Sequence, residues 1–150
     1  MTTLILPVAD MIRMGYLEDL GERGGAANPF FVLMGIEPVS FGDGRAELSM
    51  PVRPDMLNGA GWLQGGLYTA LADEAMALAL LTVLGEGERI ATISQTTQYL
   101  SGVREGCLKG TARVVRKGRT IAFTDGEIRG SDGALCARTT ASFAVMARQG

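Results

Sequence analysis

The sequence predicts one α+β domain in which a curved antiparallel sheet wraps around a single long helix. Three observations support this prediction. Residues 64–84 form an almost continuous apolar segment rich in Ala, Leu and Met, which favour helices. Residues 37–52 predict a hairpin, and residues 90–147 predict four further strands separated by turn-forming residues. A helix that is apolar on nearly all sides must be covered by other structure, and the predicted strands supply that cover.

The N-terminal part predicts a helical and then flexible lead-in over residues 1–27, followed by the compact domain over residues 28–150. Residues 8–20 have mixed helical periodicity, and a glycine-rich break follows from Gly21 to Ala27. Asn28 as N-cap and Pro29 at the first helical position then predict a short helix that Gly35 ends.

The remaining elements follow from periodicity and turn residues. The FGDG sequence at 41–44 predicts the turn of the first hairpin, after which apolar and polar residues alternate to residue 52. The long helix is predicted from Gln64 to Leu84, with Gly85 and Gly87 beyond its end. The four C-terminal strands are predicted at residues 90–100, 107–116, 119–129 and 134–147, with turns at Lys117-Gly118 and over residues 130–133.

Composition excludes several functional classes. The chain has 150 residues and a formal net charge of −2, with both signs scattered, so no basic surface for nucleic-acid binding is expected. It contains no histidine, which excludes Ser-His-Asp and Cys-His catalysis and HExxH zinc sites. Neither a GxGxxG pattern nor a GxxxxGK[ST] phosphate loop occurs. We therefore expect no bound metal and no nucleotide cofactor.

The expected location is the cytoplasm. Cys107 and Cys136 lie in predicted strands and suit a reducing compartment, and the N-terminal segment lacks the basic start of a signal peptide. The apolar segment from Leu67 to Leu84 carries Asp73 and Glu74, each of which costs roughly 2.5 to 3.5 kcal/mol in a bilayer core. This segment therefore predicts a buried helix and not a membrane span.

Residues 58–75, NGAGWLQGGLYTALADEA, resemble the signature of a known family. The phenylacetate-degradation (PaaI-like) type of hotdog-fold acyl-CoA thioesterases, within the 4-hydroxybenzoyl-CoA thioesterase superfamily, has an Asn, a loop, His-Gly-Gly and a helix reading Leu-Ala-Asp. The similarity extends from Asn28 to Phe143 and includes a strand ending in Gln-Tyr-Leu at residues 98–100. It implies a hotdog fold, hydrolysis of an acyl- or aryl-CoA thioester to free acid and CoA, and a homo-oligomer that is a dimer or a dimer of dimers.

The resemblance also implies roles for individual residues. The catalytic carboxylate falls on Asp73, the backbone oxyanion donor on Gly65, the loop amide on Asn58 and the strand hydroxyl on Thr92. Gln64 stands where the family has a histidine that orients groups in the site, and a glutamine amide can also donate and accept hydrogen bonds.

Helix geometry gives these assignments a physical basis. Gly65 at the start of the long helix leaves its N–H uncovered, and the helix dipole adds positive potential where a thioester oxygen could become negative. Asp73 lies two turns further along, about 12 Å from Gly65 at 1.5 Å per residue. One chain alone therefore cannot join the two groups. The resemblance implies a dimer with antiparallel central helices, in which Asn58, Gln64 and Gly65 of one chain meet Asp73 and Thr92 of the other.

Each assignment has a structural alternative. Asp73 could be a carboxylate at a subunit interface, and the neighbouring Glu74 is its rival for catalysis. Asn58 could serve only its turn, and Thr92 could be an ordinary strand residue. A non-catalytic protein that binds or senses acyl-CoA is the alternative function, because the family histidine is absent. A basic cluster around the predicted hairpin turn could hold the CoA phosphates or be merely solvated: Arg113, Arg116, Lys117 and Arg119.

Overall fold

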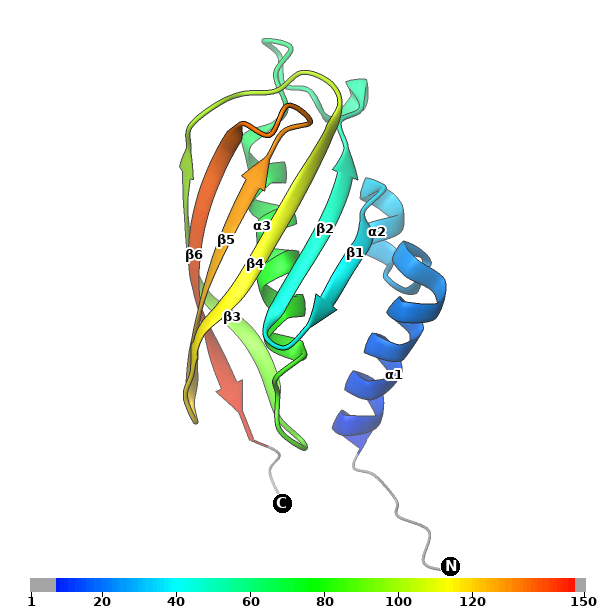
Figure 1. Ribbon diagram of the computed structural model, residues 1–150, viewed down its shortest axis with the longest axis vertical. Coiled ribbons are helices and arrows are strands. Elements are labelled where there is room, and N and C mark those ends of the chain that lie inside the picture. The colour runs from blue at the N-terminus through cyan, green and yellow to red at the C-terminus, as the bar shows by residue number, and fades with distance from the viewer. Residues whose placement is uncertain (1–7, 148–150) are drawn as a thin grey trace, which may run out of the picture.

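The structure is a computed structural model that describes residues 8–147, with side chains described from residue 15 onward. One six-stranded antiparallel sheet curves around helix α3, with strand order β1-β2-β4-β5-β6-β3 (Figure 1). This confirms the predicted α+β architecture. The strands are β1 (Glu37–Gly42), β2 (Arg45–Pro51), β3 (Arg89–Tyr99), β4 (Cys107–Lys117), β5 (Ile121–Arg129) and β6 (Leu135–Met146). The helices are α1 (Val8–Arg23), α2 (Pro29–Met34) and α3 (Gly65–Leu81), with short 3₁₀ turns at Gly24–Ala27 and Pro54–Met56.

Helix α3 forms the centre of the hydrophobic core. Leu71, Ala75 and Met76 on its sheet-facing side are fully buried, and Leu48 and Phe143 of the sheet are buried with them. Burial of large apolar side chains of this kind is the main driving force of folding, at roughly 1.5 to 3 kcal/mol for each. The predicted wrapping of the helix by the sheet is confirmed.

The helix ends earlier than its apolar sequence predicts. We expected it to run to Leu84, but it ends at Leu81, and Thr82 is its C-cap. The Thr82 hydroxyl donates to the carbonyl of Ala79 at 2.7 Å and accepts from the N–H of Gly44 at 2.9 Å. This contact with the β1–β2 turn stops the helix before the glycines are reached, and the sequence contains no local signal for it.

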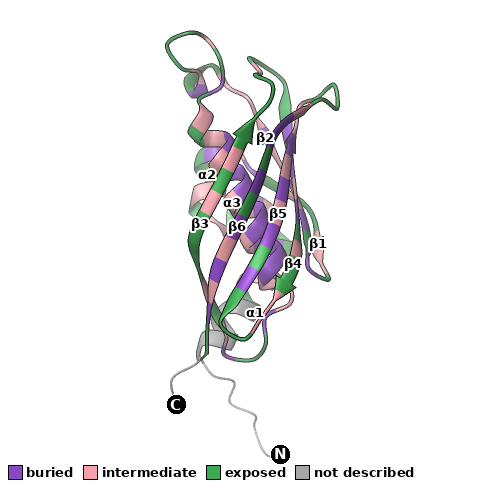
Figure 2. Ribbon diagram, turned by 90° about the vertical axis from the view of Figure 1, so that its left-hand side faces the viewer, coloured by how far each residue is buried: buried purple, intermediate pink, exposed green. Residues whose placement is uncertain are grey.

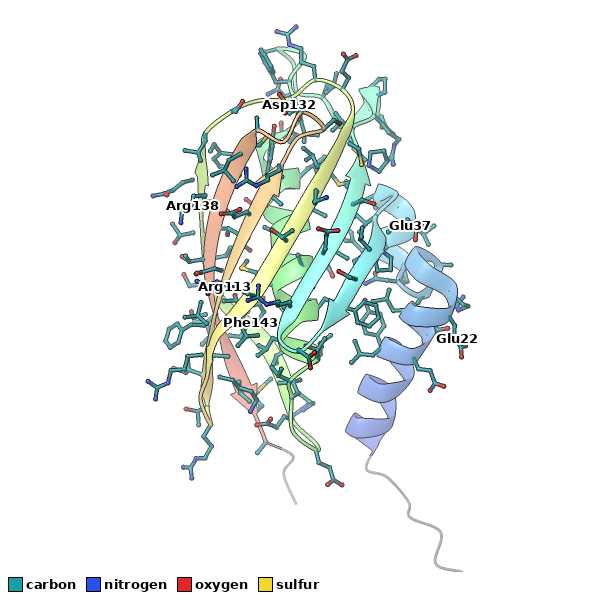
Figure 3. The ribbon with its side chains drawn as sticks, in the orientation of Figure 1. Glu22, Glu37, Arg113, Asp132, Arg138 and Phe143 are labelled. Atoms are coloured by element: carbon teal, nitrogen blue, oxygen red, sulfur yellow. The ribbon has the colours of Figure 1, made fainter. Side chains whose placement is uncertain are left out.

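The N-terminal segment also differs from the expected flexible break. Helix α1 continues to Arg23, and Gly24–Ala27 forms a 3₁₀ turn. The N–H of Gly25 donates to the Glu37 carboxylate at 2.7 Å, and Leu20 is buried in the core. The segment from Leu20 to Ala27 therefore packs against the start of the sheet, beside β1 (Figures 1 and 3).

The other local predictions are confirmed. Asn28 accepts hydrogen bonds from the N–H groups of Phe30 and Phe31, Pro29 is the first residue of α2, and Gly35 follows in a left-handed conformation with φ of 70°. The hairpin turn between β1 and β2 and the four C-terminal strands occur where the turn residues predict them, to within two residues at each end.

Strand β3 is an edge of the sheet. It pairs with β6 on one side and is exposed or half-buried along its whole length, in contrast to the buried face of α3 (Figure 2). Edge strands present unpaired N–H and C=O groups that can pair with another chain. In the part of the chain that the structure describes, no helix is long and apolar enough to span a membrane.

Candidate functional site

Asp73 lies in the middle of α3 and is held by the edge strand. The Thr92 hydroxyl donates to Asp73 Oδ1 at 3.0 Å. The carboxylate is half-buried, so it remains accessible from outside the chain. Two of the five predicted site residues therefore meet within one protomer.

A β-bulge directs Thr92 toward α3. The register of β3 with β6 shifts between Thr92 and Ser94, where Ile93 is the extra residue. Gln95 contacts α3, so its side chain lies on the inner face of the sheet. In a regular strand, side chains two residues apart share a face, so Ile93 would also point inward without the bulge. Bulges re-aim side chains in this way, often next to functional sites. Thr92 therefore reaches Asp73, and Ile93 is 57% exposed instead.

Glu74 lies on a different side of α3. Consecutive helical residues are turned by about 100°, which directs Glu74 toward α1 while Asp73 faces β3. Burial, together with the negative charge of Asp73, raises the pKa of Glu74 to about 7. Burial is also the main cause that raises the pKa of Tyr16 on α1, and the charge of Glu74 adds to it. The two adjacent carboxylates thus have different surroundings.

The first turn of α3 holds uncovered backbone donors. Gln64 is the N-cap residue, but its exposed side chain makes no capping hydrogen bond. Among the described residues, neither Gly65 N–H nor Gly66 N–H has a hydrogen-bond acceptor. Donors at a helix N-terminus stabilise negative charge through their direction and through the helix dipole. This turn can therefore bind a developing oxyanion.

Asn58 lies in the loop before α3 and folds that loop. Its Oδ1 accepts from the N–H groups of Ala60 at 3.0 Å and Trp62 at 3.1 Å. The turn role that we kept as an alternative is therefore real. The side-chain NH₂ group of Asn58 has no acceptor among residues 15–147 and remains available as a donor.

Within one protomer the predicted residues form two separate groups. Asn58, Gln64 and Gly65 lie at the N-terminal end of α3, and Asp73 with Thr92 lies two turns away. No contact joins the two groups in the described chain.

The predicted basic cluster lies on the β4–β5 hairpin, at the opposite end of the sheet from the start of α3 (Figure 1). Lys117 pairs with Glu88 at 2.8 Å and Arg113 pairs with Asp125 at 3.2 Å. Arg116 and Arg119 are exposed on the same hairpin. The cluster is therefore partly neutralised.

To the surroundings of Gly65 the structure adds two polar residues, Tyr99 and Thr69, to which the sequence patterns assigned no role. The Tyr99 hydroxyl donates to the Gly65 carbonyl at 2.9 Å and lies 2.9 Å from Thr69 Oγ1. Tyr99 was visible as part of the strand that ends in Gln-Tyr-Leu, but its contact with the helix depends on the packing of β3 against α3.

The outer face of the sheet carries a separate hollow of about 500 Å³. Its lining includes Arg113, Asp125 and Arg138 but not Asp73. Figure 3 labels the two arginines. This hollow lies on the face turned away from α3. In the described residues, no group of three or more Cys, Asp or Glu side chains could hold a metal ion.

Comparison with known proteins agrees with this architecture. Residues 60–137 match the model of the thioesterase superfamily. Thioesterase HI1161 from Haemophilus influenzae has 29% identity to this chain and a TM-score of 0.78, over 87% of this chain and 90% of its own. A variant of the phenylacetic acid degradation protein PaaI from Thermus thermophilus has 27% identity and a TM-score of 0.72, over 78% of this chain and 98% of its own. Acyl-coenzyme A thioesterase 13 from Pongo abelii is 33% identical over 94 residues, which are 62% of this chain and 66% of that protein. The chain therefore belongs to the thioesterase superfamily and is a PaaI-like thioesterase with the hotdog fold.

Proposed function

We propose that the protein hydrolyses the thioester bond of an acyl- or aryl-CoA and releases the free acid and CoA, with Asp73 as its catalytic carboxylate. The observation that carries this proposal is the bond from Thr92 to Asp73, which fixes the direction of an accessible carboxylate on α3. The name of the Pongo abelii relative supports the CoA thioester as the substrate class.

The chemistry follows from the groups present. As a general base, Asp73 takes a proton from water, and the resulting hydroxide attacks the thioester carbon. The Gly65 N–H stabilises the oxyanion, and collapse of the intermediate breaks the C–S bond and returns the proton to the leaving thiolate. As a nucleophile, Asp73 attacks the same carbon and forms an anhydride while the C–S bond breaks and the CoA thiolate leaves. Water then cleaves the anhydride to the free acid and the Asp73 carboxylate, and the proton that water releases goes to the thiolate. Both routes give the same products. The amide groups of Gln64 and Asn58 would orient the thioester and the water.

A homodimer supplies the geometry that one protomer lacks. Pairing of the β3 edges around a twofold axis would bring the two α3 helices side by side and antiparallel. Gly66, Ala70 and Ala77 share the stripe of α3 that the sheet leaves uncovered, and small residues there permit close helix contact. Asn58, Gln64 and Gly65 of one chain would then meet Asp73 and Thr92 of the other.

We further propose a dimer of dimers formed through the outer sheet face, whose charges are self-complementary. The strand register places Arg113 of β4 directly beside Asp125 of β5. The row two residues further along the strands has Glu47 on β2 at one side and Arg138 on β6 at the other. A twofold axis parallel to the strands, between β4 and β5, would set Arg113 of one copy opposite Asp125 of the other, and Glu47 opposite Arg138. Exposed apolar side chains at one end of this face could add hydrophobic contact: Val115, Ile121 and Phe123.

Three further assignments complete the proposal. Arg116 and Arg119, with Lys117 beside them, would attract the CoA phosphates. The free thiols of Cys107 and Cys136 support a cytoplasmic location. The thioesterase domain itself would span residues 28–150, with residues 1–27 as an accessory segment.

The test is thiol release from a panel of acyl- and aryl-CoAs by the purified protein and by Asp73→Asn. The amide keeps the size of the carboxylate but loses its basic charge, so we expect turnover to fall by about 10² to 10⁴-fold. The matched control is Glu74→Gln, the same chemical change one position away, which should keep turnover within a few-fold. An inactive Glu74→Gln beside an active Asp73→Asn would transfer the role to Glu74.

Acyl-CoA binding without turnover in the wild type would favour the alternative function, a non-catalytic acyl-CoA-binding protein. Subunit mass on dilution tests the composite site, because a fully active monomer contradicts it.

A further inference from the structure

Tyr99, the last residue of β3, contacts the start of α3 in two ways. Its hydroxyl donates to the Gly65 carbonyl oxygen at 2.9 Å. Its ring also packs against Gly65, since a Cβ added there would lie 3.6 Å from the ring. Tyr99 thus fixes one residue of the helix through both a polar and an apolar contact.

Polar side chains of α3 and β3 support Tyr99. Thr69 Oγ1 lies 2.9 Å from the Tyr99 hydroxyl oxygen and 3.1 Å from Thr97 Oγ1, and its single proton serves one of these two contacts. Gln95 Nε2 donates to the Thr69 carbonyl at 3.0 Å and to Thr139 Oγ1 at 3.2 Å. Thr139 is almost fully buried, at 3% exposure. The first turn of α3 is therefore tied to two strands of the sheet.

This turn needs such support. Glycine has the largest conformational freedom of any residue type, so Gly65 and Gly66 make the start of α3 flexible. The first N–H groups of a helix also have no acceptor within the helix to hold them. Gln64 provides no side-chain cap. The Gly65 carbonyl and the Gly66 N–H belong to the same planar peptide, so a bond that fixes the carbonyl also fixes the direction of that N–H. Donation to the carbonyl also polarises the peptide and strengthens the N–H as a donor.

We propose that Tyr99 is a positioning residue that holds the first turn of α3, and with it the N–H groups of Gly65 and Gly66, in the direction that the thioester oxyanion requires. This inference rests on the proposed function, in which Gly65 supplies the oxyanion donor. The Tyr99 hydroxyl acts through the peptide and not on the substrate, because its proton is already donated to Gly65. Gly66 becomes a second oxyanion donor in this arrangement.

The first experiment is Tyr99→Phe, which removes the hydroxyl and keeps the ring. We expect kcat to fall by about 3- to 10-fold, the size of one lost hydrogen bond, while KM changes less than about twofold. Tyr99 is 54% exposed, so the variant should fold. Tyr68→Phe is the matched control, because the Tyr68 ring meets Tyr99 edge-on at 5.7 Å but its hydroxyl accepts from Val103 N–H, outside the first turn. It should keep the wild-type kcat.

Thr69 provides a conservative rescue. Thr69→Val removes the hydroxyl beside Tyr99 and should lower kcat in the same direction, whereas Thr69→Ser keeps that hydroxyl and should retain kcat. A merely structural role for Thr69 predicts a lower melting temperature in the valine variant with an unchanged ratio of kcat to KM.

NMR order parameters of the Gly65 and Gly66 amides, measured from 15N relaxation without substrate, give a readout that is separate from activity. We expect lower order parameters in Tyr99→Phe, most of all at Gly66, whose N–H shares a peptide with the carbonyl that Tyr99 binds, and no change in Tyr68→Phe. Unchanged order parameters, or an unchanged kcat in Tyr99→Phe, would overturn the inference, and so would a loss that appears entirely in KM. A wild-type protein that hydrolyses no thioester overturns the proposed function and the catalytic part of this inference. The amide order parameters then still decide whether Tyr99 orders the turn.

Discussion

Replacement of Glu74 by glutamine should stabilise the protein in a pH-dependent way. Burial and the charge of Asp73 raise the pKa of Glu74 to about 7, compared with 4.5 for an ordinary glutamate. A carboxyl whose folded-state pKa is raised binds its proton more tightly in the folded state. The tighter proton binding therefore contributes fully to the free energy of unfolding below about pH 4.5, and this contribution is lost as the pH rises through 7. Glutamine resembles the protonated form in size and hydrogen bonding and does not titrate.

The expected magnitude follows from the two pKa values. The difference between 4.5 and about 7 corresponds to roughly 3 kcal/mol at 1.36 kcal/mol for each pKa unit. Glu74 is only partly buried, so screening by water reduces this to about 1 to 2 kcal/mol. Glu74→Gln should therefore lie within about 0.5 kcal/mol of the wild type near pH 5. At pH 8 it should exceed the wild-type free energy of unfolding by about 1 to 2 kcal/mol.

The assay is urea unfolding of both proteins between pH 5 and pH 8, at one fixed protein concentration because an oligomer's stability depends on it. Glu22→Gln serves as the control, since Glu22 is an exposed carboxylate on α1 (Figure 3). Parallel stability curves for the wild type and Glu74→Gln across this range would refute the reasoning. A variant that became less stable as the pH rose would give the opposite sign and refute it equally.

Two further predictions concern the N-terminal segment. Gly25→Ala should lower the free energy of unfolding by about 1 to 3 kcal/mol, because the new Cβ would collide with the carbonyl oxygen of Ile36. Gly15→Ala has open space around it in α1 and should instead raise stability by about 0.5 to 1 kcal/mol, so equal effects in thermal unfolding would contradict the packing argument. Asn28→Ala removes the N-cap of α2 and a 2.9 Å bond to the Tyr16 hydroxyl. It should cost about 1 to 2 kcal/mol in urea unfolding, and Asn28→Asp, which keeps the cap acceptor, should recover part of that loss.

Local rules determined most elements of this fold. Asn28 and Pro29 define the start of α2 because capping and a fixed φ act within a few residues. Strand alternation and turn residues located the hairpins for the same reason. The motif from Asn58 to Asp73 also predicted the family, since the helix start and the carboxylate keep their spacing along one helix.

Contacts between distant segments decided the rest. The helix stops at Leu81 because Thr82 meets Gly44, which is 38 residues away. Thr92 reaches Asp73 because a bulge at Ile93 reverses the alternation of β3, and single-sequence periodicity contains no sign of that bulge. The surroundings that separate Asp73 from Glu74, and the Tyr99 bond to Gly65, arise only when β3 and α1 pack on different sides of α3. Sequence patterns record neighbours along the chain, whereas burial, charge and hydrogen bonding at this site depend on neighbours in space.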